Sequence, residues 1–364
     1  MNRSRTRRIA ASLVFLSSGL CAQNLVSPSQ RALFEGNTSS PFPLGRANGR
    51  FQQIHADLGA TPRMITGHAY RADALGVRSP IANFDVDLQI VLADSANSPI
   101  AASTTFANNL GSNSVAVLPR AMVSFPATTR PVTDPAPTFE FRIPYSRPFA
   151  YSGTAPLLVD VVVQGNQTQR GPDLNFQAWL DAHESATDGR NDQPGYRFGN
   201  GCPAPGQSIA ASARFTATRF LDGSLQLEID SRDGVPSSVL NPATSALVIG
   251  LGVQSLPWPL NPACVLHPTL DVAVTLPGAN DVNGDWNGAL SLPSVIAAGQ
   301  RFALQVVSGA PGAQSGDATF SDGSMLTIPP LGVLPIPAAR VANSSDRDAT
   351  TGTYSRSVTV TEFF

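Results

Sequence analysis

Glycine and proline interrupt this chain so often that long regular helices have little room to form. The 364 residues include 30 glycines and 31 prolines, about one position in six. Glycine favours turns and proline removes a backbone donor, so both tend to end a helix or a strand. This spacing is typical of many short strands joined by turns, and it predicts an all-β protein.

The charged residues exclude several classes of function. The formal net charge is −2, and all 24 basic residues are arginines, because the sequence contains no lysine. A nucleic-acid-binding protein needs a clustered basic face, so we expect no nucleic-acid partner. The P-loop and the Schiff-base enzymes both need a lysine, so neither class fits this chain.

The first 22 residues have the layout of a secretory signal peptide. Four arginines lie within residues 3–8, an apolar run of 12 residues follows at 9–20, and Cys21-Ala22-Gln23 comes next. Such a run is too short to span a bilayer, so we expect no transmembrane segment and place cleavage after Ala22. The alternative is a lipid-modified Cys21. We therefore expect an exported protein, located in the periplasm, at the cell surface or outside the cell.

Cleavage at this position leaves two cysteines in the mature chain, Cys202 and Cys264. An even pair in an oxidising compartment favours a disulfide over two free thiols. Closing the long loop between them would stabilise the fold by roughly 4 kcal/mol in the chain-entropy model. Two isolated cysteines supply too few ligands, so a zinc site does not fit.

The clearest strand pattern lies at residues 84–90, where apolar Phe84, Val86, Leu88 and Ile90 alternate with polar residues. A period of two is typical of a strand with one buried face. The nearly unbroken apolar run at 157–163 predicts a central strand covered on both faces. Other strands of this half are expected at 51–54, 64–70, 115–125 and 139–143, after an extended lead-in at 23–46.

A stretch rich in glycine and proline, from Phe198 to Gly206, separates two strand-rich halves. In the second half, Asp222-Gly223 lies between two alternating runs and predicts a two-residue hairpin turn. Strands are expected at 214–220, 224–229, 246–253, 270–276, 289–292, 302–307, 325–328 and 354–363. This number of short strands favours a β-sandwich in each half.

Short segments of the first half share a recognisable pattern, namely 49–55, Ile65, Tyr70-Arg71, 106–109, 149–151 and 156–160. Together they resemble a module of uncharacterised secreted proteins from planctomycete-type bacteria. Gly201-Cys202-Pro203 and the segments 247–251 and 262–266 resemble a companion module of the same proteins. The resemblance implies an export signal, β-sandwich architecture and a bridge between the two cysteines, and it implies no activity.

The end of the chain indicates how the two halves connect. Residues 349–352 form an Ala-Thr-x-Gly turn before the last expected strand. In the proteins that this chain resembles, such a turn and strand close the first module. We therefore expect two jelly-roll or immunoglobulin-like β-sandwiches, with the second inserted into the first. The expected boundaries are 1–22 for the signal peptide, 23–46 for the lead-in, 47–198 with 335–364 for the first sandwich, and 199–334 for the second.

Two motifs could bind a metal ion. Asp281, Asn283, Asp285 and Asn287 place oxygen side chains at alternate positions, as a calcium loop does, but Leu292 stands where that loop needs an acid. A polar turn is the simpler interpretation, and calcium is the one cofactor that we consider. The second motif combines several acids with one histidine, and a solvated loop is its simpler interpretation. Its residues are Asp181, His183, Glu184, Asp188, Arg190 and Asp192.

The sequence contains no recognisable catalytic motif. A Gly-x-Ser-x-Gly elbow and a His-Glu-x-x-His pair are both missing, so we assign no catalytic residue. Trp179, Trp258 and Trp286 could stack against a sugar, although packing in a core or an interface is the simpler interpretation for at least two of them.

These observations favour an exported, non-enzymatic protein that acts by adhesion or carbohydrate binding, with a polysaccharide or another surface protein as its partner. Fold class and compartment support this hypothesis more than any site does. Two alternatives stay open. One is an extracellular hydrolase with an unrecognised site built from loops, and the other is a structural component of the cell envelope.

Overall fold

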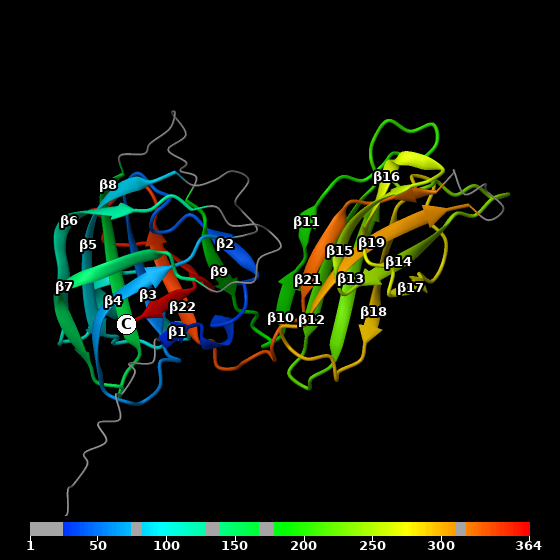
Figure 1. Cartoon of the computed structure of the whole chain (residues 1–364). Coiled ribbons are helices and arrows are strands. Elements are labelled where there is room, and N and C mark those ends of the chain that lie inside the picture. Colours follow the sequence, from blue (N-terminus) through cyan, green and yellow to red (C-terminus); the bar gives the residue numbers. More distant parts are fainter. Residues whose placement is uncertain (1–24, 74–81, 129–137, 167–177, 311–317) are drawn as a thin grey trace, which may run out of the picture.

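The computed structural model describes residues 25–73, 82–128, 138–166, 178–310 and 318–364 (Figure 1). The predicted signal peptide, its cleavage site and Cys21 lie outside these residues. The described chain contains strands β1 to β25 and three short 3-10 helices, η1 (Ser29–Arg31), η2 (Pro99–Ala101) and η3 (Phe106–Asn109). The predicted all-β class is confirmed.

One set of three sheets is built from the first and the last parts of the described chain. In spatial order, the first sheet contains β1 (Leu25–Ser27), β25 (Thr361–Phe363), β4 (Arg63–Tyr70) and β7 (Phe141–Tyr151). The second contains β2 (Thr38–Ser40), β9 (Leu180–Glu184) and β24 (Ser357–Thr359). The third contains β23 (Thr353–Ser355), β22 (Ala338–Asn343), β3 (Gly49–His55), β8 (Leu157–Asn166), β5 (Phe84–Asp94) and β6 (Val115–Phe125). Apolar side chains of these strands form one large buried cluster, which includes Phe51, Phe141 and Val161.

A second set of three sheets is built from the middle of the chain. In spatial order, its first sheet contains β10 (Asn191–Pro194), β12 (Ser212–Arg219), β13 (Leu225–Arg232) and β18 (Trp286–Leu292). The next contains β11 (Tyr196–Phe198), β21 (Gly323–Thr327), β19 (Arg301–Gly309), β14 (Thr244–Gly250) and β17 (Val272–Thr275), with β20 (Thr319–Phe320) beside β19. The last contains β15 (Val253–Trp258) and β16 (Asn261–Pro268). A separate buried cluster, with Phe215, Leu247 and Leu304 among its members, lies within this set.

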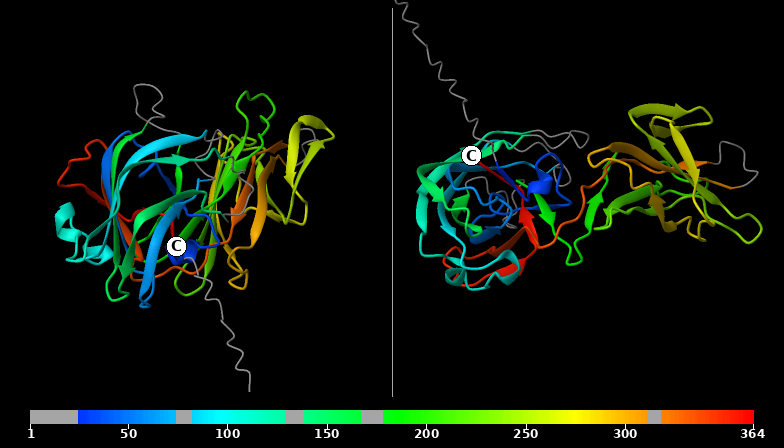
Figure 2. Two further views of the ribbon diagram at one scale, coloured as in Figure 1. Left: turned by 60° about the vertical axis from the view of Figure 1, so that its left-hand side comes forward. Right: turned by 90° about the horizontal axis from the view of Figure 1, so that it is seen from below.

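All strand pairs of the described chain join members of the same set, and Figures 1 and 2 show the two sets as two groups of strands. The chain passes from the first set to the second between β9 and β10, and returns between β21 and β22. After the return, β22 pairs with β3, β24 pairs with β9, and β25 pairs with β4 and β1. The end of the chain is therefore hydrogen-bonded to the first described residues, those of β1.

Several strand predictions are confirmed by burial and register. Phe84, Val86, Leu88 and Ile90 are buried on one face of β5. Strand β8 lies between β3 and β5, as expected for the apolar run at 157–163. The predicted hairpin joins β12 and β13, but its turn has three residues, 221–223, between the hydrogen-bonded Phe220 and Ser224 instead of two. Gly223 in this turn adopts φ +85°, a left-handed conformation that glycine accepts without a steric penalty.

Three strand predictions are wrong in a way that the pairing explains. The expected strand at 354–363 is three short strands, because the chain changes its partner at each step. The expected strand at 246–253 ends at Gly250, and β15 begins after a turn. The expected lead-in contains β1 and β2, because its backbone pairs with β25 and β9.

Candidate functional site

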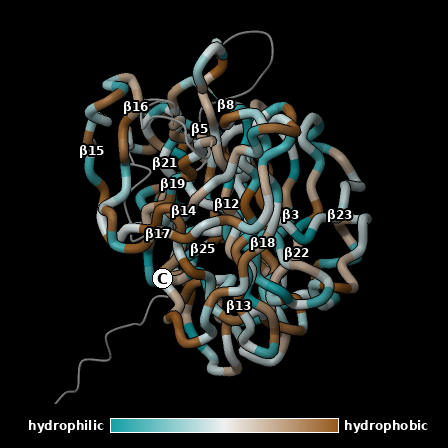
Figure 3. The backbone as a smooth tube through the Cα atoms, turned by 90° about the vertical axis from the view of Figure 1, so that its right-hand side faces the viewer, coloured by the Kyte–Doolittle hydropathy of each residue, from teal (hydrophilic) through white to brown (hydrophobic). Residues whose placement is uncertain are grey.

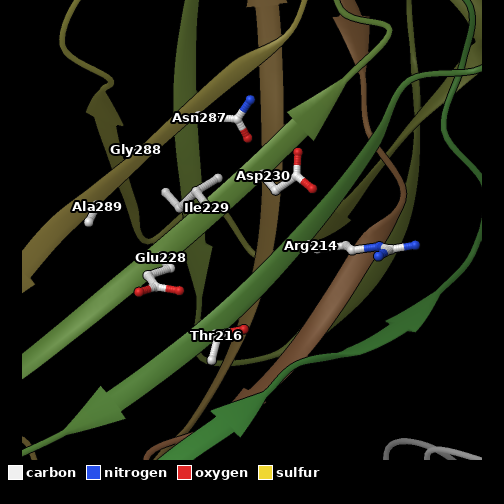
Figure 4. Close-up of a pocket in the computed structure, with 8 residues that line it drawn as sticks. All are labelled: Arg214, Thr216, Glu228, Ile229, Asp230, Asn287, Gly288 and Ala289. Carbon is white, nitrogen blue, oxygen red and sulfur yellow. The ribbon is translucent and has the colours of Figure 1, made fainter.

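A polar hollow of about 470 Å³ lies on the outer face of the β12–β13–β18 sheet (Figure 4). We call it the sheet-face hollow. Eight residues line it: Arg214, Thr216, Glu228, Ile229, Asp230, Asn287, Gly288 and Ala289.

Alternation along three neighbouring strands places these side chains. Arg214 lies opposite Asp230, and Asp230 lies opposite Asn287, so one row of polar residues crosses the sheet. Paired residues of an antiparallel sheet project from the same face, and their neighbours along the strand project from the other. Phe215 and Ile229 accordingly point into the core, while the polar row faces solvent.

Most polar groups of the sheet-face hollow are free to bind a ligand. In the described part of the chain, no hydrogen bond or ion pair engages the side chains of Arg214, Glu228 or Asn287. Asp230 is the engaged member, because its carboxylate accepts two hydrogen bonds from Arg232, at 2.9 and 3.1 Å. The hollow therefore offers an uncommitted guanidinium, an uncommitted carboxylate and an uncommitted amide on one face.

The predicted calcium residues are divided between a turn and this face. Oδ1 of Asp281 accepts the backbone N–H groups of Asn283 and Asp285, both at 2.8 Å, and these bonds lower the pKa of the Asp281 carboxyl. Oδ1 of Asp285 accepts the N–H of Asp233 at 3.0 Å. Asn287 lines the sheet-face hollow instead. The polar-turn interpretation accounts for these bonds, and calcium binding stays a prediction.

The three tryptophans differ in their surroundings. Trp286 is buried in the second core, and its indole N–H donates to the carbonyl of Pro277 at 2.9 Å, so its ring offers no face to solvent. Trp258 is half-buried and packs edge-on against Phe320, with ring centroids 5.2 Å apart. Trp179 is also half-buried and precedes β9. The predicted role in sugar stacking therefore has no support from Trp286.

The acidic segment at 181–192 contributes to a second hollow, of about 400 Å³, which we call the junction cleft. It lies where β9 of the first set approaches β10 and β12 of the second. Ten residues line it: Asn37, Thr38, Glu184, Ser185, Ala186, Arg190, Asp192, Pro194, Thr216 and Arg356. Arg190 bonds to Asp192 at 3.2 Å, and Arg356 donates to the carbonyl of Ser185 at 3.0 Å, so the cleft is lined by groups that already hold one another.

Asp181 and His183 turn away from this cleft into the interior. His183 is buried between Gln30 and Asn37, at 2.8 and 3.2 Å from their side-chain atoms. Burial and the nearby Arg31 lower its pKa well below the usual value. The possible metal motif at residues 181–192 is therefore split between a buried part and an exposed part.

The buried part is an ionic cluster that the sequence did not reveal. Ligand atoms of Glu35, Asp73 and Asp181 lie within 4.8 Å of one another, the one group of three or more potential metal ligands among the described residues. Oδ2 of Asp181 is bound by Arg71 at 2.5 Å, and Oδ1 accepts the N–H of Gly36 at 2.7 Å. Arg71 already neutralises the charge of the Asp181 carboxylate, so we interpret the cluster as structural.

Arg31 extends the cluster toward β10. Its guanidinium donates to the side chains of Gln193, at 2.6 Å, and Asn191, and to the carbonyl of Glu35 at 2.9 Å. Complete burial lowers its pKa to about 10. The N-terminal segment is thereby tied to the strand that opens the second set of sheets. Sequence could not predict these contacts, because Asn191 and Gln193 lie about 160 positions from Arg31 along the chain.

Ser27, His55 and Asp57 form a chain that superficially resembles a catalytic triad. The Ser27 hydroxyl donates to Asp57 at 2.5 Å, and it lies 2.8 Å from Nδ1 of His55. In a triad the histidine lies between the serine and the acid, whereas here the serine is the middle member. Ser27 and His55 are wholly buried, and burial lowers the pKa of His55 to about 3. These three residues therefore cannot activate a nucleophile for a substrate in solvent.

The predicted disulfide between Cys202 and Cys264 is present. It joins the loop after β11 to β16, and its sulfurs pack with Val248, Leu266 and Phe320 in a small buried cluster. The backbone of Cys202 is also bound to Phe320, whose carbonyl accepts its N–H at 2.9 Å. The bridge fastens the β15–β16 hairpin to the face of the β14–β19 sheet.

Comparison with known proteins adds no family to these observations. No family model, no curated protein and no solved structure matches the chain. Within the described residues, none of the helical segments has the length and hydropathy of a membrane span. The resemblance to secreted planctomycete-type modules therefore stays a prediction.

Proposed function

We propose that this chain is an exported, non-enzymatic protein that binds carbohydrate at or outside the cell surface through the sheet-face hollow. The observation that supports this proposal is the set of uncommitted side chains of Arg214, Glu228 and Asn287 in one open hollow. Sugar hydroxyls both donate and accept hydrogen bonds, so a guanidinium, a carboxylate and an amide complement them.

The proposed architecture is a pair of β-sandwiches, with the second inserted into the first. It is supported by two sets of sheets that share no strand pair in the described chain, and by the pairing of β22, β24 and β25 with strands of the first set. Export is supported by the disulfide, which forms and persists in oxidising compartments. In this arrangement the hollow lies on the inserted sandwich, away from the first core.

A glycan array with the mature protein, with and without EDTA, tests this function. We expect binding to a subset of glycans, and a loss of about tenfold to a hundredfold for Glu228→Gln and for Arg214→Met. Arg347→Met is the matched control, because Arg347 is an exposed arginine of the first set of sheets. No binding under either condition would remove the proposal. Binding that EDTA abolishes would assign calcium a role at Asp281 and Asp285.

A second candidate function is hydrolysis of a glycosidic bond. Glu228 and Asp230 project from the same face of β13 two positions apart, which spaces them by about 7 Å along the strand. Inverting glycosidases place their two carboxyl groups about 6.5–9.5 Å apart. Release of reducing sugar from a bound glycan, abolished by Glu228→Gln while binding is retained, would favour this function over simple binding.

A further inference from the structure

Strand β17 is an uncovered edge of the largest sheet in the second set. It is the last strand of the order β11–β21–β19–β14–β17, and no other described strand pairs with its outer edge. All four of its residues, Val272, Ala273, Val274 and Thr275, are exposed. Natural edge strands are usually protected by charges, prolines or bulges, and this one contains none of them.

The two valines of β17 extend the buried face of the sheet beyond its last strand. Val274 lies opposite Leu247, and Val272 lies opposite Ile249, in the register with β14. Paired residues share a face, and Leu247 is wholly buried in the second core, so both valines are on the core side. Val272 is nevertheless 50% exposed, because nothing in the described chain covers this side of β17.

Apolar side chains continue around this edge. Leu251, Val253, Leu256 and Leu270 are each about half exposed or more, and they lie on β15 and in the turns that flank β15 and β17. Figure 3 shows β15, β16 and β17 along one side of the molecule. An exposed apolar area of this kind marks an interaction surface more often than a free surface.

The edge carries almost no charge. Asp271 is the one Asp, Glu, Arg or Lys between residues 251 and 275. Its carboxylate accepts the N–H of Leu251 and the hydroxyl of Thr269, both at 2.7 Å. The carboxylate is thus turned toward its own chain. Two copies of this surface could therefore meet without like charges facing each other, and no basic residue is available to hold an anionic lipid surface.

We propose that β17 pairs with β17 of a second copy, in an antiparallel arrangement about a twofold axis. Another strand can replace the water on the unpaired N–H and C=O groups of this edge with a regular ladder of hydrogen bonds, which a bilayer cannot do. A twofold axis normal to the sheet keeps the core sides of both copies on one face. Both valines of each copy lie opposite a valine of the other only if Ala273 lies opposite Ala273, which pairs Val272 of each copy with Val274 of the other. Such an isologous contact is closed and gives a dimer.

Sedimentation velocity over a range of concentrations tests the proposal on the mature chain. We expect a concentration-dependent dimer for the wild type and a dissociation constant at least about tenfold weaker for Val274→Lys, which places a charge on the edge. Val239→Lys is the matched control, since Val239 is fully exposed in another loop. A monomer at every concentration, growth into open aggregates, or equal weakening by Val239→Lys would each overturn the proposal.

Cross-linking provides a second readout that does not depend on the charged variant folding. Directly opposed antiparallel residues have Cα atoms about 4.5–5.5 Å apart, a distance that a disulfide can bridge. Ala273→Cys should therefore give a reducible covalent dimer under mild oxidation, and Ala289→Cys, an exposed alanine of β18, should not. Absence of the Ala273→Cys dimer, or its equal formation by Ala289→Cys, contradicts the register.

Discussion

Arg71 and Asp181 form an ion pair in which both side chains are wholly buried, with 2.5 Å between Nη2 and Oδ2. The same guanidinium donates to the carbonyls of Arg31 and Phe34, and the same carboxylate accepts the N–H of Gly36. The pair therefore fixes the N-terminal segment against β4 and β9. A buried charge that loses its partner cannot be solvated, which makes this pair a sensitive point of the fold.

We expect Arg71→Met to lower the free energy of unfolding by about 3–5 kcal/mol, because it leaves the Asp181 carboxylate buried without its cation. Arg232→Met, which removes the exposed partner of Asp230, should cost less than about 1 kcal/mol. Chemical denaturation of both variants measures the difference. Similar losses in the two variants would show that the buried pair is not coupled to folding.

Acidification should destabilise the protein through its buried histidines. Burial lowers the pKa of His55 and of His68 to about 3, and that of His183 falls well below its usual value. The unfolded chain then binds more protons than the folded chain below a pH of about 6.5, so stability falls as the pH falls toward 3. His55 and His68 each account for a loss of roughly 2–3 kcal/mol of stability near pH 4.5, relative to neutral pH.

Two variants isolate this effect in the melting temperature as a function of pH. His68→Phe should flatten the dependence between about pH 6.5 and 4, because it removes one titrating ring. Tyr145→Phe removes the hydrogen bond between Tyr145 and Nδ1 of His68 and should leave the slope intact. Burial raises the pKa of Asp57, which acts in the opposite sense and offsets part of the loss. An unchanged slope in His68→Phe would contradict the assignment.

Phe363 holds the last strand in the first core. Its ring is 2% exposed and lies with its centroid 5.0 Å from that of His55 and 6.3 Å from that of His68. Phe363→Ala should destabilise the protein by about 3–5 kcal/mol, as large-to-small changes in a core do. Met64→Ala changes an exposed residue of the neighbouring strand β4 and should stay within about 0.5 kcal/mol. Equal urea midpoints would show that the last strand is dispensable.

The disulfide between Cys202 and Cys264 closes a loop of 62 residues, so the chain-entropy model assigns it roughly 4 kcal/mol. We expect the double variant Cys202→Ala/Cys264→Ala to unfold at a correspondingly lower denaturant concentration. A reducing agent should destabilise the wild type and leave the double variant unchanged. If reduction shifts both proteins equally, the effect lies elsewhere in the chain.

Sequence predicts the parts of this fold that depend on neighbouring residues. The alternation at Phe84–Ile90 and the glycine of the hairpin turn depend on local geometry, and the structure has a strand and a turn at these positions. Strand β16 is absent from the predicted strands, because Pro262 and Pro268 normally exclude a central strand. Among the described strands it pairs with β15 alone. The buried role of Arg31 escaped prediction because a single charged residue in a polar segment gives no local signal of a distant partner.

For the candidate site, too, sequence predicts the local pattern but not the contacts between distant strands. Alternation along β13 predicts that Leu225, Leu227 and Ile229 face inward, and therefore that the polar residues between them face solvent. It does not reveal which strands lie beside β13, so Arg214 and Asn287 could not be assigned to the same hollow as Glu228. The sequence singled out Asn287 as part of a calcium motif, whereas the structure places it in the sheet-face hollow.

The return of the chain to its first set of sheets has a consequence for proteolysis. A protease that cuts between β9 and β10 would produce a C-terminal fragment that still contains β22, β24 and β25. These strands remain hydrogen-bonded to β3, β9 and β4 of the other fragment. The nicked protein should elute as one particle under native conditions and separate into two bands only when denatured. A single cleavage at this point would therefore not release the sheet-face hollow from the first set of sheets.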